Sequence, residues 1–279
     1  MQAERCYADD LVLVIPLGAA AKEHGPHLPL NNDAIIDGWL TDEFMRRLPV
    51  VIAPLINASY YPAFTDYTGS ISLRLETARN LILDTCNSLS RHGLSRFYVL
   101  NTSLSTLRPL AEVARALDAA IRFGYMDLDA ALQFLPVDLL QQQYGSHADE
   151  HETSLMLHIA PRVIDMDRAV DEGEGRLTRN SGQSTWSATG VYGQATLASE
   201  EKGRVIAEVL LTRCLEEIEN LSNDRGMKQV LIVIDTILVE SPNGRDEMFP
   251  PHFNLMALAV NSVIMLRINA RLQKFPIFI

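Results

Sequence analysis

The stretch Leu11-Val-Leu-Val-Ile15, followed by Pro16-Leu-Gly18, decides the fold of this chain. A continuous aliphatic and β-branched run predicts a strand buried on both faces, because a strand with one wet face would alternate apolar and polar residues. Pro16 to Gly18 then predicts a turn. Strands of this kind occur mainly in parallel sheets that helices cover on both sides.

Further strands and helices alternate along the chain. Short apolar runs predict strands at 50–53, 96–100 and 121–125, and helical spacing of apolar residues predicts helices at 33–48, 77–92, 107–120 and 200–221. Residues 171–199 are rich in Gly, Ser and Thr and predict a long loop. The alternation predicts an α/β fold with a mostly parallel central sheet covered on both faces.

The composition is that of an ordinary globular protein, with 279 residues, 47% hydrophobic and 21% charged. A net charge of −11 without a Lys/Arg cluster argues against a nucleic-acid partner. The apolar stretch 255–268 is broken by Asn261 and Arg267 and is shorter than the about 20 residues of a membrane span, so no membrane partner is expected. Residues 1–10 lack the apolar segment of a signal peptide.

The cysteines, Cys6, Cys86 and Cys214, are widely spaced and form no CxxC pair, which argues against a disulfide framework and a thiolate zinc site. A reduced, cytoplasmic setting is expected. The character of the chain changes near residue 221, where the acidic part gives way to a nearly neutral tail. We expect a main domain of residues 1–221 and an appended segment of residues 222–279 that packs on it or on a neighbouring subunit.

Two segments carry most of the chemistry. The first is Glu23-His-Gly-Pro-His27, followed by Asp33, and the second is His147-Ala-Asp-Glu-His-Glu-Thr-Ser154. Four of the seven histidines lie in these segments beside carboxylates, a ligand set that suits zinc, manganese or iron. The first segment begins just past the 11–15 strand, where open α/β sheets usually place their sites.

Each residue of the first segment has two interpretations. His24 is either a packed histidine or a metal ligand, and the ligand is favoured because Gly25 allows close backbone approach and Pro26 stiffens the loop. Asp33 is either a ligand or the N-cap of a helix. His27 is expected to support the site or face substrate. Lys22 is expected to be a solvated charge, with the alternative that a lysine beside a metal orients a carbonyl.

The second segment opens another predicted helix, with Thr153 or Ser154 as a candidate N-cap. Glu152 is either a ligand or a first-turn acid that complements the helix dipole. His147 and His151 are four apart and would share one helical face, as in two-histidine zinc motifs, although the pattern is not HExxH. One of them is a candidate ligand and the other a candidate proton shuttle. Asp149 and Glu150 have the plainer interpretation of solvated acids, which is favoured for Glu150.

These segments resemble the creatininase (creatinine amidohydrolase) family. Pro16-Leu-Gly-Ala and Glu23-His-Gly-Pro-His-Leu-Pro-Leu-Asn-Asn-Asp33 resemble its first signature, and His147-Ala followed by Glu152-Thr-Ser-Leu-Met-Leu157 resembles its second. Tyr67-Thr-Gly-Ser-Ile-Ser-Leu73 and Gly190-Val-Tyr-Gly193 through Gly203 resemble other landmarks. The resemblance covers about residues 10 to 221.

The resemblance implies a three-layer α/β/α sandwich with a di-metal centre that hydrolyses an amide, often cyclic or a formamide. It places His24 and Asp33 on metal ligands, with Asp33 bridging, and Glu152 on the glutamate of the second signature. It places His147 on a histidine near the substrate. Members of the family usually form homo-oligomers, commonly hexamers.

The chain departs from the family pattern at two places. The family's glutamate stands two residues before the histidine, where this chain has Lys22, so the adjacent Glu23 is expected to reach the metal through a bulge. After the third strand the family has Asn-Gly-His, whose histidine is a ligand, whereas this chain has Asn101-Thr-Ser103. Either His151 replaces that ligand from another direction, or one metal position is weak or lost.

Together these features predict a metal-dependent hydrolase of a non-peptide C–N bond in an amide, cyclic amide or formamide, acting through metal-activated water. The expected ligands are Glu23, His24, Asp33 and Glu152, holding one or two divalent ions, zinc or manganese before iron. His147 and His151 are the candidates for proton transfer. The residues expected to contact a small amide substrate are His27, Tyr67, Ser103 and Trp186, with Phe64 beside them. The alternative is a creatininase-like protein that has lost catalysis and binds a small molecule or a partner.

Overall fold

A four-stranded parallel sheet forms the centre of the molecule, in a computed structural model that describes residues 11–173 and 187–223. Its strands are β1 (Val12–Leu17), β2 (Val50–Ile52), β3 (Arg96–Asn101) and β4 (Arg122–Tyr125), in the order β2-β1-β3-β4. Each neighbouring pair is parallel, and Ile15 of β1 lies opposite Val99 of β3. The predicted mostly parallel sheet is therefore confirmed.

Strand β1 is buried along its whole length, as its uninterrupted aliphatic sequence predicts. Successive side chains of a strand point to opposite faces. Leu13 and Ile15 accordingly join one hydrophobic core, while Val12 and Val14 join another. Each fully buried aliphatic side chain contributes roughly 1.5–3 kcal/mol, so a polar residue at any of these positions would weaken one of the two cores.

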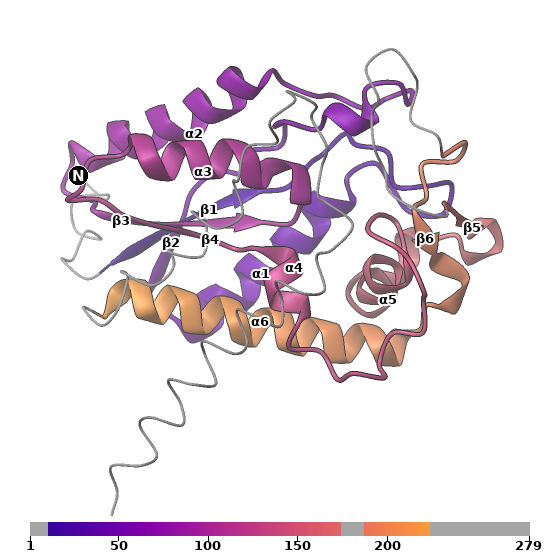
Figure 1. The fold of residues 1–279 in the computed structure, drawn as a ribbon. Helices are drawn as coiled ribbons and strands as arrows, with labels where there is room; N and C mark the ends of the chain where they lie inside the picture. The colour runs from indigo at the N-terminus through magenta and orange to yellow at the C-terminus, as the bar shows by residue number, and fades with distance from the viewer. Residues whose placement is uncertain (1–10, 174–186, 224–279) are drawn as a thin grey trace, which may run out of the picture. The chain divides into compact units, whose positions relative to one another are not determined.

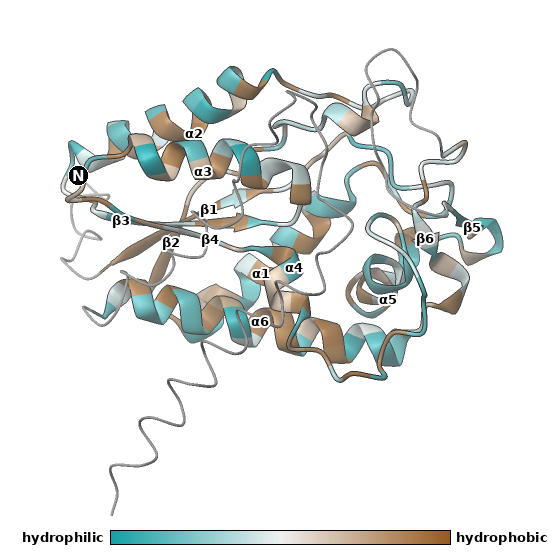
Figure 2. Ribbon diagram, viewed as in Figure 1, coloured by the Kyte–Doolittle hydropathy of each residue, from teal (hydrophilic) through white to brown (hydrophobic). Residues whose placement is uncertain are grey.

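Helices cover both faces of the sheet, which gives the predicted three-layer α/β/α sandwich (Figure 1). Helices α2 (Leu75–Ser90) and α3 (Leu107–Ala116) lie on one face. Helices α1 (Asn32–Arg47) and α6 (Glu200–Ser222) lie on the other. Along these helices hydrophobic and hydrophilic residues are interspersed, as expected where one side packs on a sheet and the other meets water (Figure 2).

Helix α5 (Glu150–Ile159) packs closely on α6, beyond the carboxyl ends of the strands (Figure 1). Gly203 of α6 makes this contact close, because a Cβ at that position would lie 1.8 Å from the backbone oxygen of Ser154. The close crossing holds the N-terminal turn of α5, and with it Glu152, against the rest of the domain.

The ends of several elements differ from the sequence expectation. Asp149, rather than Thr153 or Ser154, is the N-cap of α5, and its side chain accepts hydrogen bonds from the backbone N–H groups of His151 and Glu152. Glu150 is not solvated but is buried and ion-paired with Lys202 of α6. Both corrections have the same cause: packing on α6 buries the first turn of α5, so its acids need partners.

The connecting segments differ as well. Helix α3 ends at Ala116, four residues before the predicted end, and the short helix α4 (Leu128–Leu132) was not predicted. The predicted 171–199 loop contributes a small antiparallel pair, β5 (Asp171–Glu172) with β6 (Gly193–Gln194). No helix among the described residues is long and apolar enough to cross a membrane.

The predicted boundary near residue 221 remains a prediction, because residues 224–279 lie outside the described part of the chain. Helix α6 runs to Ser222, one residue past the expected end. Cys86 and Cys214 are buried free thiols, whereas Cys6 lies among the residues that are not described.

Candidate metal centre

The site residues come together beyond the carboxyl ends of the parallel strands. The loop after β1 carries Lys22 and His24, and the first turn of α1 carries Asp33. The turn after β3 carries Ser103, and the first turn of α5 carries Glu152. Parallel strands end at one edge of a sheet, so segments far apart in the sequence meet there.

His24 links a backbone carbonyl to a buried carboxylate. Its Nδ1 lies 2.8 Å from the backbone oxygen of Lys22, and because a carbonyl only accepts, Nδ1 carries a hydrogen. Its Nε2 lies 2.8 Å from Oδ1 of Asp33. A proton on Nε2 makes this contact a hydrogen bond, and a metal ion bound to Nε2 would take the place of that proton.

Asp33 is completely buried yet remains ionised. Burial raises the pKa of its carboxyl, but the neighbouring charges of Lys22 and His24 outweigh burial and hold that pKa well below its usual range. The carboxylate is thus a fixed negative charge at the centre of the site.

His147 directs its Nδ1 atom toward Glu152. Its Nε2 donates to the backbone oxygen of Glu23 at 2.6 Å, which leaves Nδ1 as an acceptor 3.6 Å from Oε2 of Glu152. Burial, together with the positive charges of His24 and Lys22, lowers the pKa of His147 well below its ordinary value. The neutral imidazole that results is the form that binds metals and accepts protons.

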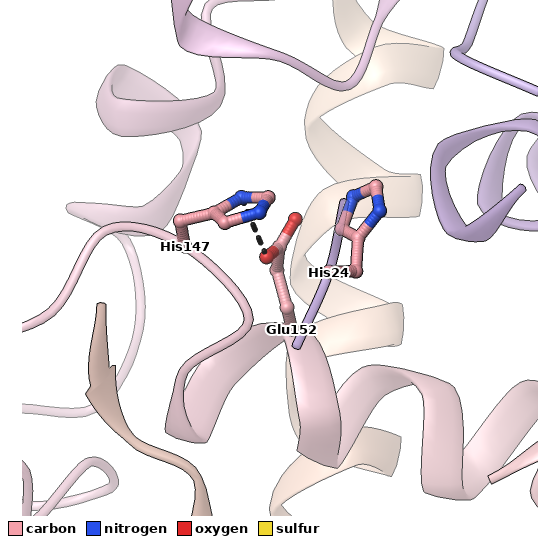
Figure 3. A group of neighbouring side chains, drawn as sticks. All are labelled: His24, His147 and Glu152. Atoms are coloured by element: carbon pink, nitrogen blue, oxygen red, sulfur yellow. Dashed lines mark ion pairs between the residues drawn. The ribbon is translucent and has the colours of Figure 1, made fainter. Parts of the chain in front are cut away.

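His24, His147 and Glu152 form a compact buried group with Glu152 between the two imidazoles (Figure 3). Each offers one ligand atom, and these atoms lie within 4.8 Å of one another. Ligands at the usual distances of about 2.0–2.2 Å from zinc lie up to roughly 4 Å apart, so small side-chain adjustments would bring all three onto one ion. The donor set fits a divalent metal.

Lys22 lies on the other side of the Asp33 carboxylate. Its side chain was expected to be solvated, but it is buried, with only 2% exposed. Its Nζ lies 2.7 Å from Oδ2 of Asp33 and donates to Oγ of Ser103 at 3.3 Å. The rings of Tyr61 and Phe64 each lie 5.3 Å from Nζ. The buried charge is tolerated because a carboxylate compensates it and aromatic faces attract it.

The structure does not bring the carboxylate of Glu23 into the ligand group. The Glu23 side chain packs on Gly190, where a Cβ would lie 2.4 Å from its Cγ, and burial raises the pKa of its carboxyl. Its backbone instead serves the site, because its carbonyl holds His147 and its N–H donates to Ser70.

The predicted substrate residues lie around this group. Nε2 of His27 lies 2.9 Å from Oγ1 of Thr153, and burial and the charge of His24 lower the pKa of His27 to about 4. The hydroxyl of Tyr67 donates to the backbone oxygen of Ser187 at 2.6 Å. Trp186 lies outside the described residues.

His151 is not a member of the compact group formed by His24, His147 and Glu152. Its Nδ1 pairs with Asp149 at 2.6 Å. Burial lowers the pKa of His151, but Asp149 outweighs burial and raises that pKa to about 9. Its ring lines a cavity of about 100 Å³ together with Asp129 and Gln142. His151 is therefore protonated at neutral pH and does not replace the missing histidine ligand in this conformation.

Sequence reasoning missed two residues near the site, Asp37 and Tyr61. Asp37, one helical turn after Asp33, is also completely buried, and burial and the Asp33 charge raise the pKa of Asp37 well above its usual range. Its spacing from Asp33 was the available signal. Phe64, which was expected beside the substrate residues, packs on His147 with ring centroids 4.4 Å apart. Tyr61 carries no signal of its own in the sequence.

Fold and site define an α/β/α sandwich with a buried imidazole and carboxylate centre suited to a divalent metal. The family model described as Creatininase, creatinine amidohydrolase, matches residues 1–218. The chain belongs to the creatininase family.

Curated relatives agree with this assignment. The chain is 26% identical over 231 residues to a creatinine amidohydrolase of Pseudomonas putida, covering 74% of this chain and 87% of the relative. It is also 26% identical over 227 residues to a mycofactocin precursor peptide peptidase of Mycolicibacterium smegmatis, covering 77% of this chain and 87% of the relative.

Solved creatininase structures share the fold. A mutant creatininase described as the Zn-Zn type is 25% identical, with a TM-score of 0.65, covering 78% of this chain and 94% of that chain. A creatininase described as a manganese form is 24% identical, with a TM-score of 0.61 and the same coverage.

Proposed function

We propose that this chain is a metal-dependent amidohydrolase that cleaves a non-peptide C–N bond in a small amide, cyclic amide or formamide. The observation that carries the proposal is the buried group of imidazoles and carboxylates, in which His24 Nε2 lies 2.8 Å from Oδ1 of Asp33 and His24, His147 and Glu152 offer ligand atoms within 4.8 Å of one another. Membership of a family whose relatives include a creatinine amidohydrolase supports the same reaction class.

The residues that would hold the metal are His24, Asp33 and Glu152, with His147 beside them. A bound divalent ion lowers the pKa of a water and polarises the scissile carbonyl. Zinc and manganese are the leading candidates, because solved relatives are described as zinc and manganese forms. Iron has the same ligand preference and is the third candidate.

The chain's own residues would manage the protons. His147 is neutral, and its Nδ1 faces Glu152, so it can accept a proton at that atom. The ring is held in place by the backbone oxygen of Glu23 and by contact with Phe64. His151 carries a proton at neutral pH and is the candidate donor to the leaving nitrogen.

The remaining roles are part of the same proposal. His27, Tyr67, Ser103 and Trp186 would contact a small substrate, and Glu23 would join the metal only if its side chain turned from Gly190. The chain would act in the cytoplasm as a homo-oligomer, with a hexamer expected from the family. No nucleic-acid or membrane partner is proposed, given the net charge of −11.

A second candidate function is binding without catalysis. It is favoured by Lys22 and Ser103, which stand at two places where the family pattern has ligands. A creatininase-like binding protein would hold its ligand or partner without turnover.

Metal content and hydrolysis together test the proposal. Protein purified without chelator is measured by elemental analysis, and turnover is screened on cyclic amides, formamides and linear amides. The His24→Ala variant is expected to lose the metal and all turnover, whereas His92→Ala, at an exposed position after α2, should behave as the wild type. Stoichiometric metal without turnover would support the binding protein, and absence of metal with unchanged His24→Ala behaviour would reject the hydrolase.

A further inference from the structure

We propose, on the basis of the proposed function, that the ammonium of Lys22 occupies the Oδ2 side of the Asp33 carboxylate. The centre would then bind a single divalent ion per chain. The ion would lie on the Oδ1 side, among His24, Asp33 and Glu152. The ammonium of Lys22 takes the place of a second ion on the Oδ2 side.

The geometry around Oδ2 of Asp33 carries this inference. Nζ of Lys22 lies 2.7 Å from that oxygen, a distance typical of a charge-assisted hydrogen bond. A zinc ion bound to the same oxygen at about 2.0–2.2 Å would meet the ammonium at close range, and the two positive charges would repel each other. The oxygen therefore accepts the ammonium or a metal ion, but not both.

Lys22 is held in this place by both its backbone and its side chain. Its N–H donates to the backbone oxygen of Leu30 at 3.0 Å, and its carbonyl accepts from Nδ1 of His24 at 2.8 Å. The ammonium lies 5.3 Å from the ring centroids of both Tyr61 and Phe64 and is almost completely shielded from water. Withdrawing it would leave the buried Asp33 carboxylate uncompensated on that side.

The second hydrogen-bond partner of the Lys22 ammonium, Ser103, also disfavours a second ion. Ser103 Oγ accepts from Nζ at 3.3 Å, and Ser105 Oγ lies 3.4 Å further on. Neutral hydroxyls are weak ligands for zinc compared with imidazole, thiolate and carboxylate. Among the described residues, the hydrogen-bond partners of the Lys22 ammonium are thus the Asp33 carboxylate and the Ser103 hydroxyl, so it brings one positive charge and no imidazole or thiolate to the Oδ2 side.

Calorimetric titration of the metal-free wild-type chain with zinc tests the inference directly. The expected result is one tight site per chain, with elemental analysis giving one zinc. Two tight sites would overturn the inference and leave the proposed hydrolase intact. No tight site would instead reject the metal-dependent function, so the two failures are distinguishable.

A double variant supplies the second test. Lys22→Glu with Ser103→His replaces the ammonium by a carboxylate and the hydroxyl by an imidazole, and we expect the zinc content to rise from one to two per chain. Arg91→Glu makes the same charge change at an exposed position after α2 and should stay at one. A double variant that keeps the wild-type circular dichroism spectrum and still binds one zinc would also overturn the inference.

Discussion

The two oxygens of Asp33 face opposite kinds of neighbour. Oδ1 faces Nε2 of His24 at 2.8 Å, a ring nitrogen that can hold either a proton or a metal ion. Oδ2 faces the ammonium of Lys22 at 2.7 Å, so that side is already neutralised within the chain. One buried carboxylate is therefore satisfied partly by folding and partly by what the site binds.

Asp37 shows what happens to a carboxyl without such partners. It is as deeply buried as Asp33 and lies one helical turn away on α1. Burial and the Asp33 charge raise the pKa of Asp37, whereas Lys22 and His24 outweigh burial and lower the pKa of Asp33. Neighbouring charge, rather than depth, decides which acid is ionised.

The largest effect is expected from Asp33→Asn, which removes the charge that both sides share. We expect the free energy of unfolding to fall by about 3–5 kcal/mol, because the ammonium of Lys22 stays buried without a partner. Zinc binding should also be lost. Urea unfolding and elemental analysis measure the two effects.

Asp37→Asn is the matched control for Asp33→Asn. Burial and the Asp33 charge raise the pKa of Asp37 and favour its neutral form, which an amide resembles, so the change in stability should stay below about 1 kcal/mol. Equal destabilisation by the two variants would contradict the contrast between the two acids.

Lys22→Met tests the Oδ2 side alone. Without metal, the variant should lose about 3 kcal/mol of stability, because Asp33 keeps a buried charge without its ammonium. Added zinc should restore part of that loss by supplying positive charge near Asp33. Urea unfolding with and without zinc measures both effects.

Lys202→Met is the control for Lys22→Met, since it also breaks an ion pair with a buried acid, Glu150, but away from Asp33. Zinc should stabilise this variant no more than the wild type. Equal zinc gains in Lys22→Met, Lys202→Met and the wild type would mean that the metal does not compensate the charge of Asp33.

Glu152→Gln tests the Oδ1 side. Its carboxylate accepts from the Ala148 N–H and lies beside His147 Nδ1. Zinc affinity should fall by more than the roughly 10- to 100-fold seen for outer-shell partners, because a ligand charge is removed. Calorimetric titration measures the affinity, and Glu208→Gln, at a 74% exposed side chain, should leave it unchanged. Unchanged affinity in Glu152→Gln would remove this residue from the ligand set.

The smallest effect concerns Asp129, which lines the cavity next to His151. Burial and the charge of Asp127 raise the pKa of Asp129 to about 6. Because the pKa of Asp129 is higher in the folded state than in the unfolded state, the protonated carboxyl stabilises the fold. That stabilisation is complete below the unfolded-state pKa near 4 and is lost as pH rises through 6. Asp129→Asn should therefore match the wild type at pH 4 and exceed its stability by about 2 kcal/mol at pH 8.

Urea unfolding at the two pH values measures this difference. Asp138→Asn, at an exposed position, should show no such pH-dependent gain. A wild type and an Asp129→Asn variant with parallel pH profiles would show that Asp129 titrates normally.

Much of the fold could be predicted from periodicity. The 11–15 run, the later apolar runs and the helical spacing between them led to a parallel sheet between helices, and the strands fall within a residue or two of the expected positions. The two histidine segments also met at the predicted edge of the sheet. Asp149 was misjudged because its role as N-cap depends on where α5 begins, which packing on α6 decides.

The sequence by itself determined which residues were available: a buried parallel strand, imidazoles and carboxylates in two short segments, and the departures at Lys22 and Ser103. Only the tertiary structure decided their roles. It directed His24 and His147 inward through hydrogen bonds to backbone carbonyls, turned His151 to Asp149, and buried Lys22 against Asp33. The physical reason is that the charge and hydrogen-bonding state of a side chain depend on the groups around it, and strands, loops and helices distant in sequence supply those groups.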